Sequence, residues 1–272
     1  MTFIPAHLLV GSIDAPNLAF VLHGILGSAQ NLQGFVRKLH AARSDWGFVL
    51  SDVRGHAGSM NAPEPHSLQA CAGDLEQLAA QLGRRPRALI GHSFGGKVCL
   101  QYAQHSAEGL EQLWLLDTSP GLVQLDENSE VGKVMAAAVS VAQPITQRSE
   151  VARAMRERGL PDKIASWMTT NLRRVGEHYE WAVNFDIART LLADYAASDF
   201  WPFLEAEKTS GLESHWIVGE HSDRISPAQR ERGAALPVSA KVHVHVLPGA
   251  GHWVHVDNPQ GLVDLMGLHL PR

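Results

Sequence analysis

Gly91-His92-Ser93-Phe94-Gly95-Gly96 is the most informative stretch of this chain. It follows the apolar run 87–90 and opens a segment with helical apolar spacing, Lys97–Gln104. A strand, a sharp turn with G-x-S-x-G and a helix, in that order, are typical of a nucleophile elbow, which exposes the serine hydroxyl above a sheet edge. We therefore predict that Ser93 is a catalytic nucleophile and that the Phe94 amide forms part of an oxyanion hole.

Short apolar runs recur along the chain, with amphipathic segments between them. The runs are Leu18–Leu22, Phe48–Ser51, Ala88–Ile90, Leu113–Leu116, Trp216–Val218 and Val242–Leu247. This alternation predicts an α/β fold with a mostly parallel central sheet flanked by helices. Helix starts are indicated by Ser67 before Leu68–Leu82, by Ser226-Pro227 and by Asn258-Pro259.

The strand signal disappears between Pro120 and about Phe203. Helical stretches replace it, around Val131–Val141, Glu150–Arg158, Asp162–Arg173 and Ile187–Ala197. Open α/β sheets bind ligands at the carboxyl ends of their strands, so an all-helical insertion after the strand ending at Asp117 is expected to cover that site as a cap. We predict a core formed by residues 1–120 and 204–272 and a cap formed by residues 121–203.

A serine nucleophile needs a base and a group that orients the base. Among 15 histidines, His252 is favoured because it lies in a glycine-containing loop, Pro248-Gly249-Ala250-Gly251-His252-Trp253, directly after the last predicted strand. In serine hydrolases with a nucleophile elbow, the acid follows the nucleophile and precedes the base in the sequence. Asp117, at a strand's carboxyl end, is the preferred acid, and Asp223, in the loop after the next strand, is the alternative.

The second oxyanion donor is predicted in His23-Gly24-Ile25-Leu26-Gly27-Ser28, which follows the first apolar run. Its glycines let the backbone curl so that the Ile25 amide faces the amide after the nucleophile, with the Leu26 amide as the alternative. Residues predicted to contact substrate are His23, Gly24, His92, Trp181 and Trp253.

A metal site is not predicted, and the proposed chemistry needs no cofactor. His243 and His245 alternate with valines, so they share one face of a strand, but the sequence offers no third ligand with suitable spacing. We interpret them as a solvated or partly covered strand face. Cys71 and Cys99 lie in predicted helices without disulfide or metal spacing, which indicates two reduced, buried thiols.

Charge and hydropathy narrow the classes of partner. The formal net charge is −5 with both signs interspersed, so no basic face for nucleic acid is expected. No apolar run approaches the roughly 18 residues of a membrane span, and residues 1–7 lack a basic leader. We expect a soluble, cytoplasmic protein that acts on a small-molecule ester, as a monomer or a weak dimer.

Together, these motifs resemble the α/β-hydrolase superfamily, and within it the small cap-bearing bacterial carboxylesterases of the YbfF type. The resemblance is nearly end to end and also rests on Asp52-Val53-Arg54-Gly55-His56, Asp117-Thr118-Ser119-Pro120 and Gly251-His252-Trp253-Val254-His255. It implies an α/β-hydrolase fold and Asp117 as the acid. The chain departs from the pattern at Ala57, where glycine is usual, and at His221, where asparagine is usual.

The sequence thus predicts a serine hydrolase that cleaves carboxylic esters with short to medium acyl chains through an acyl-enzyme. A thioesterase for acyl-CoA or an acyl carrier remains an alternative, because it would use the same triad. Two further alternatives remain. One is a cofactor-free haloperoxidase or carbon–carbon hydrolase, and the other is a non-catalytic ligand-binding protein on the same scaffold. A haloalkane dehalogenase is disfavoured, because it would need aspartate where Ser93 stands.

Overall fold

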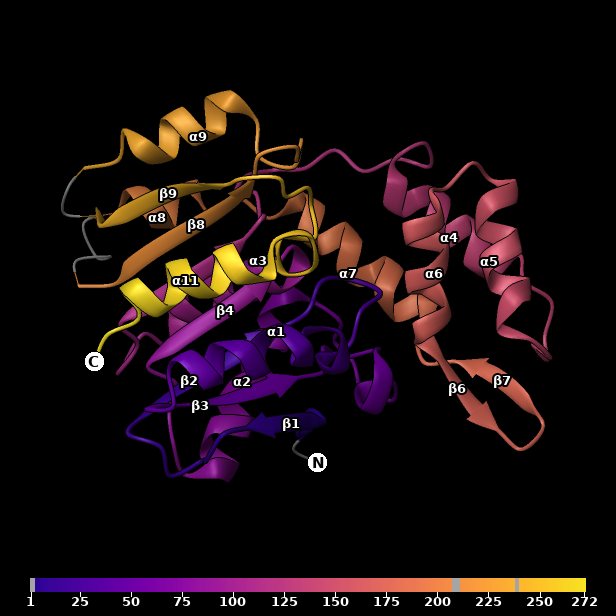
Figure 1. Ribbon diagram of the computed structural model, residues 1–272, viewed down its shortest axis with the longest axis horizontal. Helices are drawn as coiled ribbons and strands as arrows, with labels where there is room; N and C mark the ends of the chain where they lie inside the picture. Colours follow the sequence, from indigo (N-terminus) through magenta and orange to yellow (C-terminus); the bar gives the residue numbers. More distant parts are fainter. Residues whose placement is uncertain (1–2, 207–210, 238–239) are drawn as a thin grey trace.

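A seven-stranded sheet runs through the molecule in the order β1-β3-β2-β4-β5-β8-β9 (Figure 1). The computed structural model describes residues 3–206, 211–237 and 240–272. All neighbouring strands of this sheet are parallel except β1, which pairs antiparallel with β3. The strands are β1 (His7–Val10), β2 (Asn17–Leu22), β3 (Trp46–Ser51), β4 (Ala88–His92), β5 (Gln112–Leu116), β8 (Glu213–Gly219) and β9 (Val242–Leu247). The predicted mostly parallel sheet is confirmed, and β1 is an edge strand that the sequence analysis did not predict.

Helices cover both faces of the sheet. On one face, α1 (Ala29–Ala42) and α11 (Pro259–His269) share an apolar core with side chains such as Trp114 of β5. On the other face, α2 (Leu68–Leu82) and α3 (Phe94–His105) pack in a second core. The remaining helices of the α/β part are α8 (Trp201–Glu205), α9 (Pro227–Ala234) and α10 (Val254–Asp257), with a short 3-10 turn at Ala57–Ser59. The sheet is therefore the middle layer of three, as its fully buried central strands require.

Side-chain caps fix three of the predicted helix starts. The Ser67 hydroxyl accepts a hydrogen bond from the Ala70 amide at 3.1 Å and begins α2. Ser226 caps α9 in the same way, and the Asn258 side chain caps α11. Each cap satisfies an amide that has no partner inside its helix, which explains why these local signals were readable from the sequence.

The insert that follows β5 contains four helices and a hairpin before α8 begins. The helices are α4 (Glu130–Val139), α5 (Arg148–Glu157), α6 (Asp162–Met168) and α7 (Phe185–Ala197), with a short 3-10 turn at Thr169–Asn171. Strands β6 (Leu172–Val175) and β7 (His178–Trp181) form an antiparallel pair. The prediction of an all-helical insert, with one helix reaching Arg173, was therefore wrong. A two-residue turn with Gly176 at φ 60° lets the chain reverse and pair as strands.

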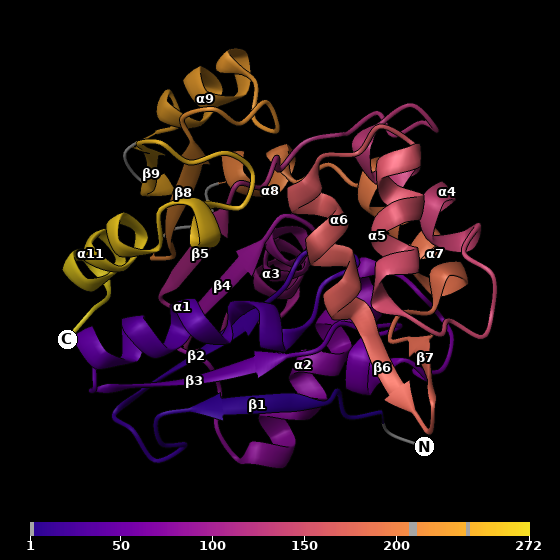
Figure 2. The same cartoon turned by 45° about the vertical axis from the view of Figure 1, so that its right-hand side comes forward.

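The insert is joined to the core by main-chain and side-chain hydrogen bonds. The Ala57 amide donates to the Ala182 carbonyl at 2.7 Å, and the Asn184 amide donates to the Gly55 carbonyl at 2.8 Å. The insert lies on the side toward which the parallel strands point, as the two views show (Figures 1 and 2). It therefore lies at the sheet edge where α/β folds bind ligands.

Two further observations concern the cysteines and the length of the helices. Cys71 on α2 and Cys99 on α3 are buried and unpaired with each other, and burial raises the pKa of both thiols. Within the described ranges, none of the helices combines the length and apolar character needed to cross a membrane.

Candidate active site

The elbow between β4 and α3 holds Ser93 in a backbone conformation that most residues avoid. Its φ is 50° and its ψ is −115°. The flanking glycines are required by space, because a Cβ at Gly91 would lie 2.4 Å from the Gly95 carbonyl oxygen, and one at Gly95 would lie 2.7 Å from that of His23. This strained turn leaves the Ser93 side chain partly exposed at the carboxyl end of β4.

Asp117 and His252 meet beside this turn. Nδ1 of His252 lies 2.8 Å from Oδ2 of Asp117, and the Asp117 side chain is fully buried. The Gly219 amide donates to the other carboxylate oxygen, Oδ1, at 3.1 Å, and the Ser222 hydroxyl donates to Oδ2 at 2.5 Å. A buried carboxylate with several donors accepts the imidazole N–H and fixes the ring's orientation, which leaves Nε2 as the free basic nitrogen.

The alternative acid, Asp223, lies elsewhere. Its side chain is 97% exposed and pairs with Arg224 at 3.8 Å between Oδ1 and Nε. The structure thus brings Asp117, and not Asp223, to His252. The partner that the sequence analysis missed is Ser222, which precedes Asp223 and faces Asp117. Its position in the sequence was a usable signal, because it is the slot where many hydrolases place the acid.

The loop after β2 presents the candidate oxyanion amides. The Leu26 amide donates to Nε2 of His56 at 3.0 Å, so the alternative donor is already engaged. Within the described residues, the Ile25 amide has no hydrogen-bond acceptor. Phe94 is the first residue of α3, where an amide has no partner inside its helix. Ile25, Phe94 and Ser93 all line one cavity.

Two buried neutral histidines hold this loop. Nε2 of His23 accepts from the Val53 amide at 2.9 Å, and Nδ1 donates to the Gly24 carbonyl at 2.7 Å. Burial lowers the pKa of His23 to about 4, and burial with the nearby His23 ring lowers the pKa of His56 to about 3. Their hydrogen bonds fix the backbone of the loop at Gly24 and Leu26. The sequence analysis did not assign this role to His56, although the motif 52–56 contains it.

His92 supports the loop that carries the candidate base. Its Nε2 donates to the His252 carbonyl at 2.9 Å, and its ring centroid lies 4.7 Å from that of His255. Burial is the main cause that lowers the pKa of His92 well below its ordinary value and that of His255 to about 3. Gly24 lies against the same ring, since a Cβ there would come within 2.9 Å of Nδ1 of His92.

The cavity above these residues has a volume of about 120 Å³. His23, Gly24, His92 and Trp253 line it, as the sequence analysis predicted, together with Ser93, Asp117 and His252. The insert contributes apolar side chains: Val123, Leu125, Val131, Val134, Ile164, Trp167, Leu192 and Tyr195. Trp181 is not among the lining residues, because its ring packs against Phe185 at 5.2 Å between centroids. Its predicted contact with substrate has no support in the structure.

A second cluster of polar side chains lies away from this cavity. The sequence offered only His243 and His245 as a metal pair without a third ligand. The structure supplies further groups from the neighbouring strand, since ligand atoms of Glu213, His215 and His243 lie within 4.8 Å of one another. Strand pairing between β8 and β9 creates this proximity, which sequence spacing does not reveal.

Comparisons with known proteins agree with this architecture. The Alpha/beta hydrolase family matches residues 19–265. The mouse (Mus musculus) sn-1-specific diacylglycerol lipase ABHD11 is 30% identical over 263 residues, covering 95% of this chain and 82% of that protein. Esterase YbfF of Escherichia coli (strain K12) is 25% identical over 251 residues, covering 92% of this chain and 91% of its own length.

Among solved structures, one described as "Marine microorganism esterase" superposes with a TM-score of 0.80 at 20% identity, covering 97% of this chain and 98% of the other. At this identity the likeness concerns the fold. The family match extends over most of the chain and includes the elbow, the strands from β3 to β9 of the large sheet and the loop of His252. The protein is therefore a hydrolase that belongs to the Alpha/beta hydrolase family.

Proposed function

We propose that this hydrolase cleaves carboxylic esters with short to medium acyl chains through an acyl-enzyme intermediate. The proposal rests above all on the 2.8 Å contact between Nδ1 of His252 and Oδ2 of Asp117, at a cavity that the strained Ser93 also lines. A base oriented by a buried carboxylate beside an elbow serine is the arrangement that nucleophilic acyl transfer needs.

In the proposed mechanism, the Ser93 hydroxyl attacks the ester carbonyl and Nε2 of His252 takes its proton. Asp117 keeps the imidazole in the tautomer with the proton on Nδ1 and stabilises the imidazolium. His252 then protonates the leaving alcohol, and an acyl-enzyme forms on Ser93. Water activated by the same nitrogen releases the carboxylic acid.

The anionic oxygen of each tetrahedral intermediate is bound by the amides of Ile25 and Phe94. Each donor of this kind contributes about 3 to 4 kcal/mol to the transition state. The His23 and His56 hydrogen bonds hold the first of these amides in place, because they fix the backbone on both sides of Ile25.

We further propose that residues 121–203 act as a cap that binds the acyl chain. Apolar side chains of α4, α6 and α7 line the cavity, among them Val134, Ile164 and Leu192. Trp253 lines it from the core side and packs against Trp167 at 5.7 Å between ring centroids. An apolar wall around a few polar groups suits an acyl chain with a reactive carbonyl at one end.

The names of two relatives favour an ester over a thioester as the substrate of this chain. The names of the mouse and E. coli proteins describe a diacylglycerol lipase and an esterase. Both align with more than nine-tenths of this chain. The proposed acyl-transfer chemistry is shared by both substrate classes, so a panel must contain both.

The test is hydrolysis of p-nitrophenyl esters from acetate to palmitate, beside a matched acyl-CoA series, with wild type and Ser93→Ala. We expect wild type to turn over short or medium esters and the variant to lose at least about 1,000-fold in kcat with an unchanged melting temperature. Labelling of Ser93 by a serine-directed phosphonate is the second readout. Equal rates for both proteins, or faster turnover of acyl-CoA, would contradict the esterase proposal.

A further inference from the structure

Four histidines and a glutamate gather at the amino end of β8 and β9, opposite the end that carries Ser93. Glu213 and His215 lie on β8, His243 and His245 on β9, and His269 ends α11. The ring centroid of His215 lies 4.9 Å from that of His243 and 5.1 Å from that of His269. His215 and Gly219 are four residues apart on β8, so roughly 13 Å of strand separates this cluster from the catalytic edge.

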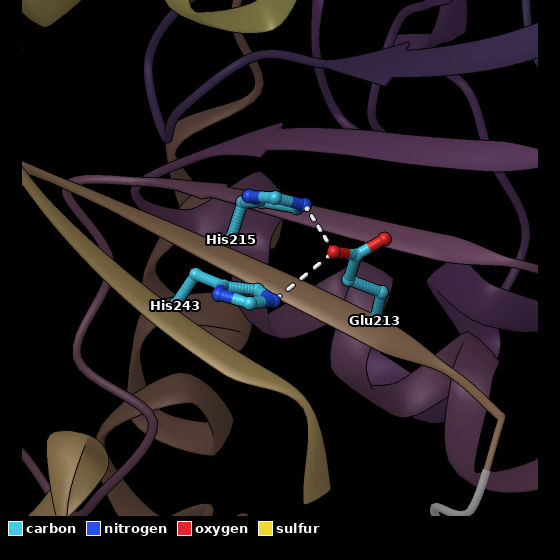
Figure 3. A group of neighbouring side chains, drawn as sticks. All are labelled: Glu213, His215 and His243. Atoms are coloured by element: carbon cyan, nitrogen blue, oxygen red, sulfur yellow. Dashed lines mark ion pairs between the residues drawn. The ribbon is translucent and has the colours of Figure 1, made fainter. Parts of the chain in front are cut away.

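Three atoms of the cluster are arranged as ligands of one ion. Oε1 of Glu213 lies 3.4 Å from Nε2 of His215 and 3.0 Å from Nε2 of His243. Figure 3 shows both rings turned toward the same carboxylate oxygen. Ligand atoms bound at 2.0–2.1 Å around a tetrahedral Zn²⁺ lie about 3.3 Å apart, so the two spacings to Oε1 of Glu213 need little adjustment. All three ligand atoms lie within 4.8 Å of one another.

Neighbouring groups orient two of these ligands. The Gln112 amide donates to Oε2 of Glu213 at 2.8 Å and to the His269 carbonyl at 2.9 Å. The same amide nitrogen also lies 3.5 Å from Nε2 of His215. Oε1 of Glu213 is left to face the histidines. Nδ1 of His215 lies 3.0 Å from Nε2 of His245. With a proton on Nδ1 donated to His245, Nε2 of His215 presents a lone pair, as in a metal-bound histidine.

Burial makes one side of the cluster rigid and leaves the other open. The His215 side chain is fully buried, and its ring stacks on Trp114 at 4.1 Å and 7°. The His243 side chain is 45% exposed, so an ion can enter from solvent.

We propose that Glu213, His215 and His243 bind a divalent transition-metal ion such as Zn²⁺, with water completing the coordination. Two imidazoles and one carboxylate form a ligand set that such ions accept. The ion ties the edge strand β9 to β8 through side chains of both strands. Its role is structural, because the site lies at the opposite end of the sheet from Ser93.

The test begins with protein stripped by a chelator and dialysed against ZnCl₂, with bound zinc quantified by mass spectrometry. We expect about one ion per chain and a zinc-dependent rise in melting temperature, because an ion that binds only the folded state stabilises it. Co²⁺ in place of Zn²⁺ should give the visible absorption bands of a low-symmetry site with nitrogen and oxygen ligands.

Three variants locate the ion. His243→Gln should abolish stoichiometric binding of zinc and the melting-temperature shift, whereas His252→Gln should retain both, since His252 lies at the other end of the sheet. His245→Gln should weaken binding about 10- to 100-fold, as expected for a group that orients a ligand. Absence of zinc uptake by wild type, or loss of uptake in His252→Gln but not in His243→Gln, would overturn the proposal.

Discussion

The Ser222 hydroxyl donates a hydrogen bond to Oδ2 of Asp117, the carboxylate oxygen that also contacts Nδ1 of His252. The Gly219 amide occupies the other oxygen, Oδ1. A fully buried carboxylate is costly unless donors satisfy it, and these three donors surround it. Ser222 therefore positions the proposed acid, which orients the proposed base.

Replacing Ser222 by alanine should lower kcat about 10-fold with little change in KM. The lost bond is made to a charged group, and its absence lets the carboxylate turn away from His252. Steady-state hydrolysis of the best p-nitrophenyl ester measures this effect.

Ser222→Thr is the conservative control, because it keeps the hydroxyl and should retain most of the activity. In an Asp117→Asn background, Ser222→Ala should have almost no further effect, since both act on the same contact. An equal loss in both backgrounds would show that Ser222 acts independently of Asp117 and would contradict the positioning role.

The choice between the two candidate acids has a direct test. Asp117→Asn should lower kcat about 10,000-fold, because the amide favours the wrong tautomer of His252. Asp223→Asn should change kcat less than about two-fold, since the Asp223 side chain is 97% exposed and faces Arg224. Circular dichroism of both variants checks that the fold is intact, and a larger loss in Asp223→Asn would refute the assignment.

The acyl chain is expected to lie against α4. Val131 lines the cavity, so Val131→Phe should shorten the preferred acyl chain and reduce kcat/KM for medium-chain esters at least about 10-fold relative to acetate. Val139, on the same helix, is 58% exposed and does not line this cavity. Val139→Phe is the matched control and should leave the chain-length profile unchanged.

Lys97 joins the elbow helix to the insert. Its fully buried ammonium donates to the carbonyls of Gly121, Tyr195 and Ser198 at 2.7, 2.7 and 2.8 Å. Lys97→Met keeps the apolar stem but leaves three carbonyls without this donor. The free energy of unfolding in urea should fall by about 3 kcal/mol.

Lys163→Met is the control for this substitution. Lys163 pairs with Asp257, but its side chain is 46% exposed, so the loss should stay below about 1 kcal/mol. Equal losses for the two variants would mean that water replaces the Lys97 ammonium at its three carbonyls.

Acid should destabilise the fold through its buried histidines. The pKa of His23 is lowered from 6.5 to about 4, so between these values the unfolded chain binds a proton that the folded chain does not. Stability is therefore fully present above pH 6.5 and is lost as the pH falls toward 4, by about 3 kcal/mol for this residue. Urea unfolding at a series of pH values measures the slope.

His23→Gln should reduce that slope by about 1.4 kcal/mol per pH unit between pH 4.5 and 6. His178→Gln is the comparison, because the His178 side chain is 38% exposed on the hairpin. Parallel curves for wild type and His23→Gln would contradict a buried, neutral His23.

Much of the fold follows from local patterns in the chain. Apolar runs and capping residues such as Ser67 predict strands and helix starts, because each depends on neighbours only a few residues away. The elbow was readable because its residue pattern is local, although the space that requires Gly95 is set by the His23 carbonyl of a distant segment. The hairpin of β6 and β7 was missed because four-residue strands give little periodicity.

The site depended on contacts between distant parts of the chain. Asp117 and His252 are 135 residues apart, and the positive φ of Asp117, 51°, helps to turn its carboxylate inward. Whether Asp117 or Asp223 reaches His252 depends on the path of the loop after β8, and no residue pattern reports that path. His56 was not assigned its contact with the Leu26 amide, nor was Glu213 paired with His243, because strand register and loop packing create both contacts. Residue types and spacing are therefore sufficient to predict the fold and to propose candidate residues, whereas backbone dihedrals and packing select the side chains that meet.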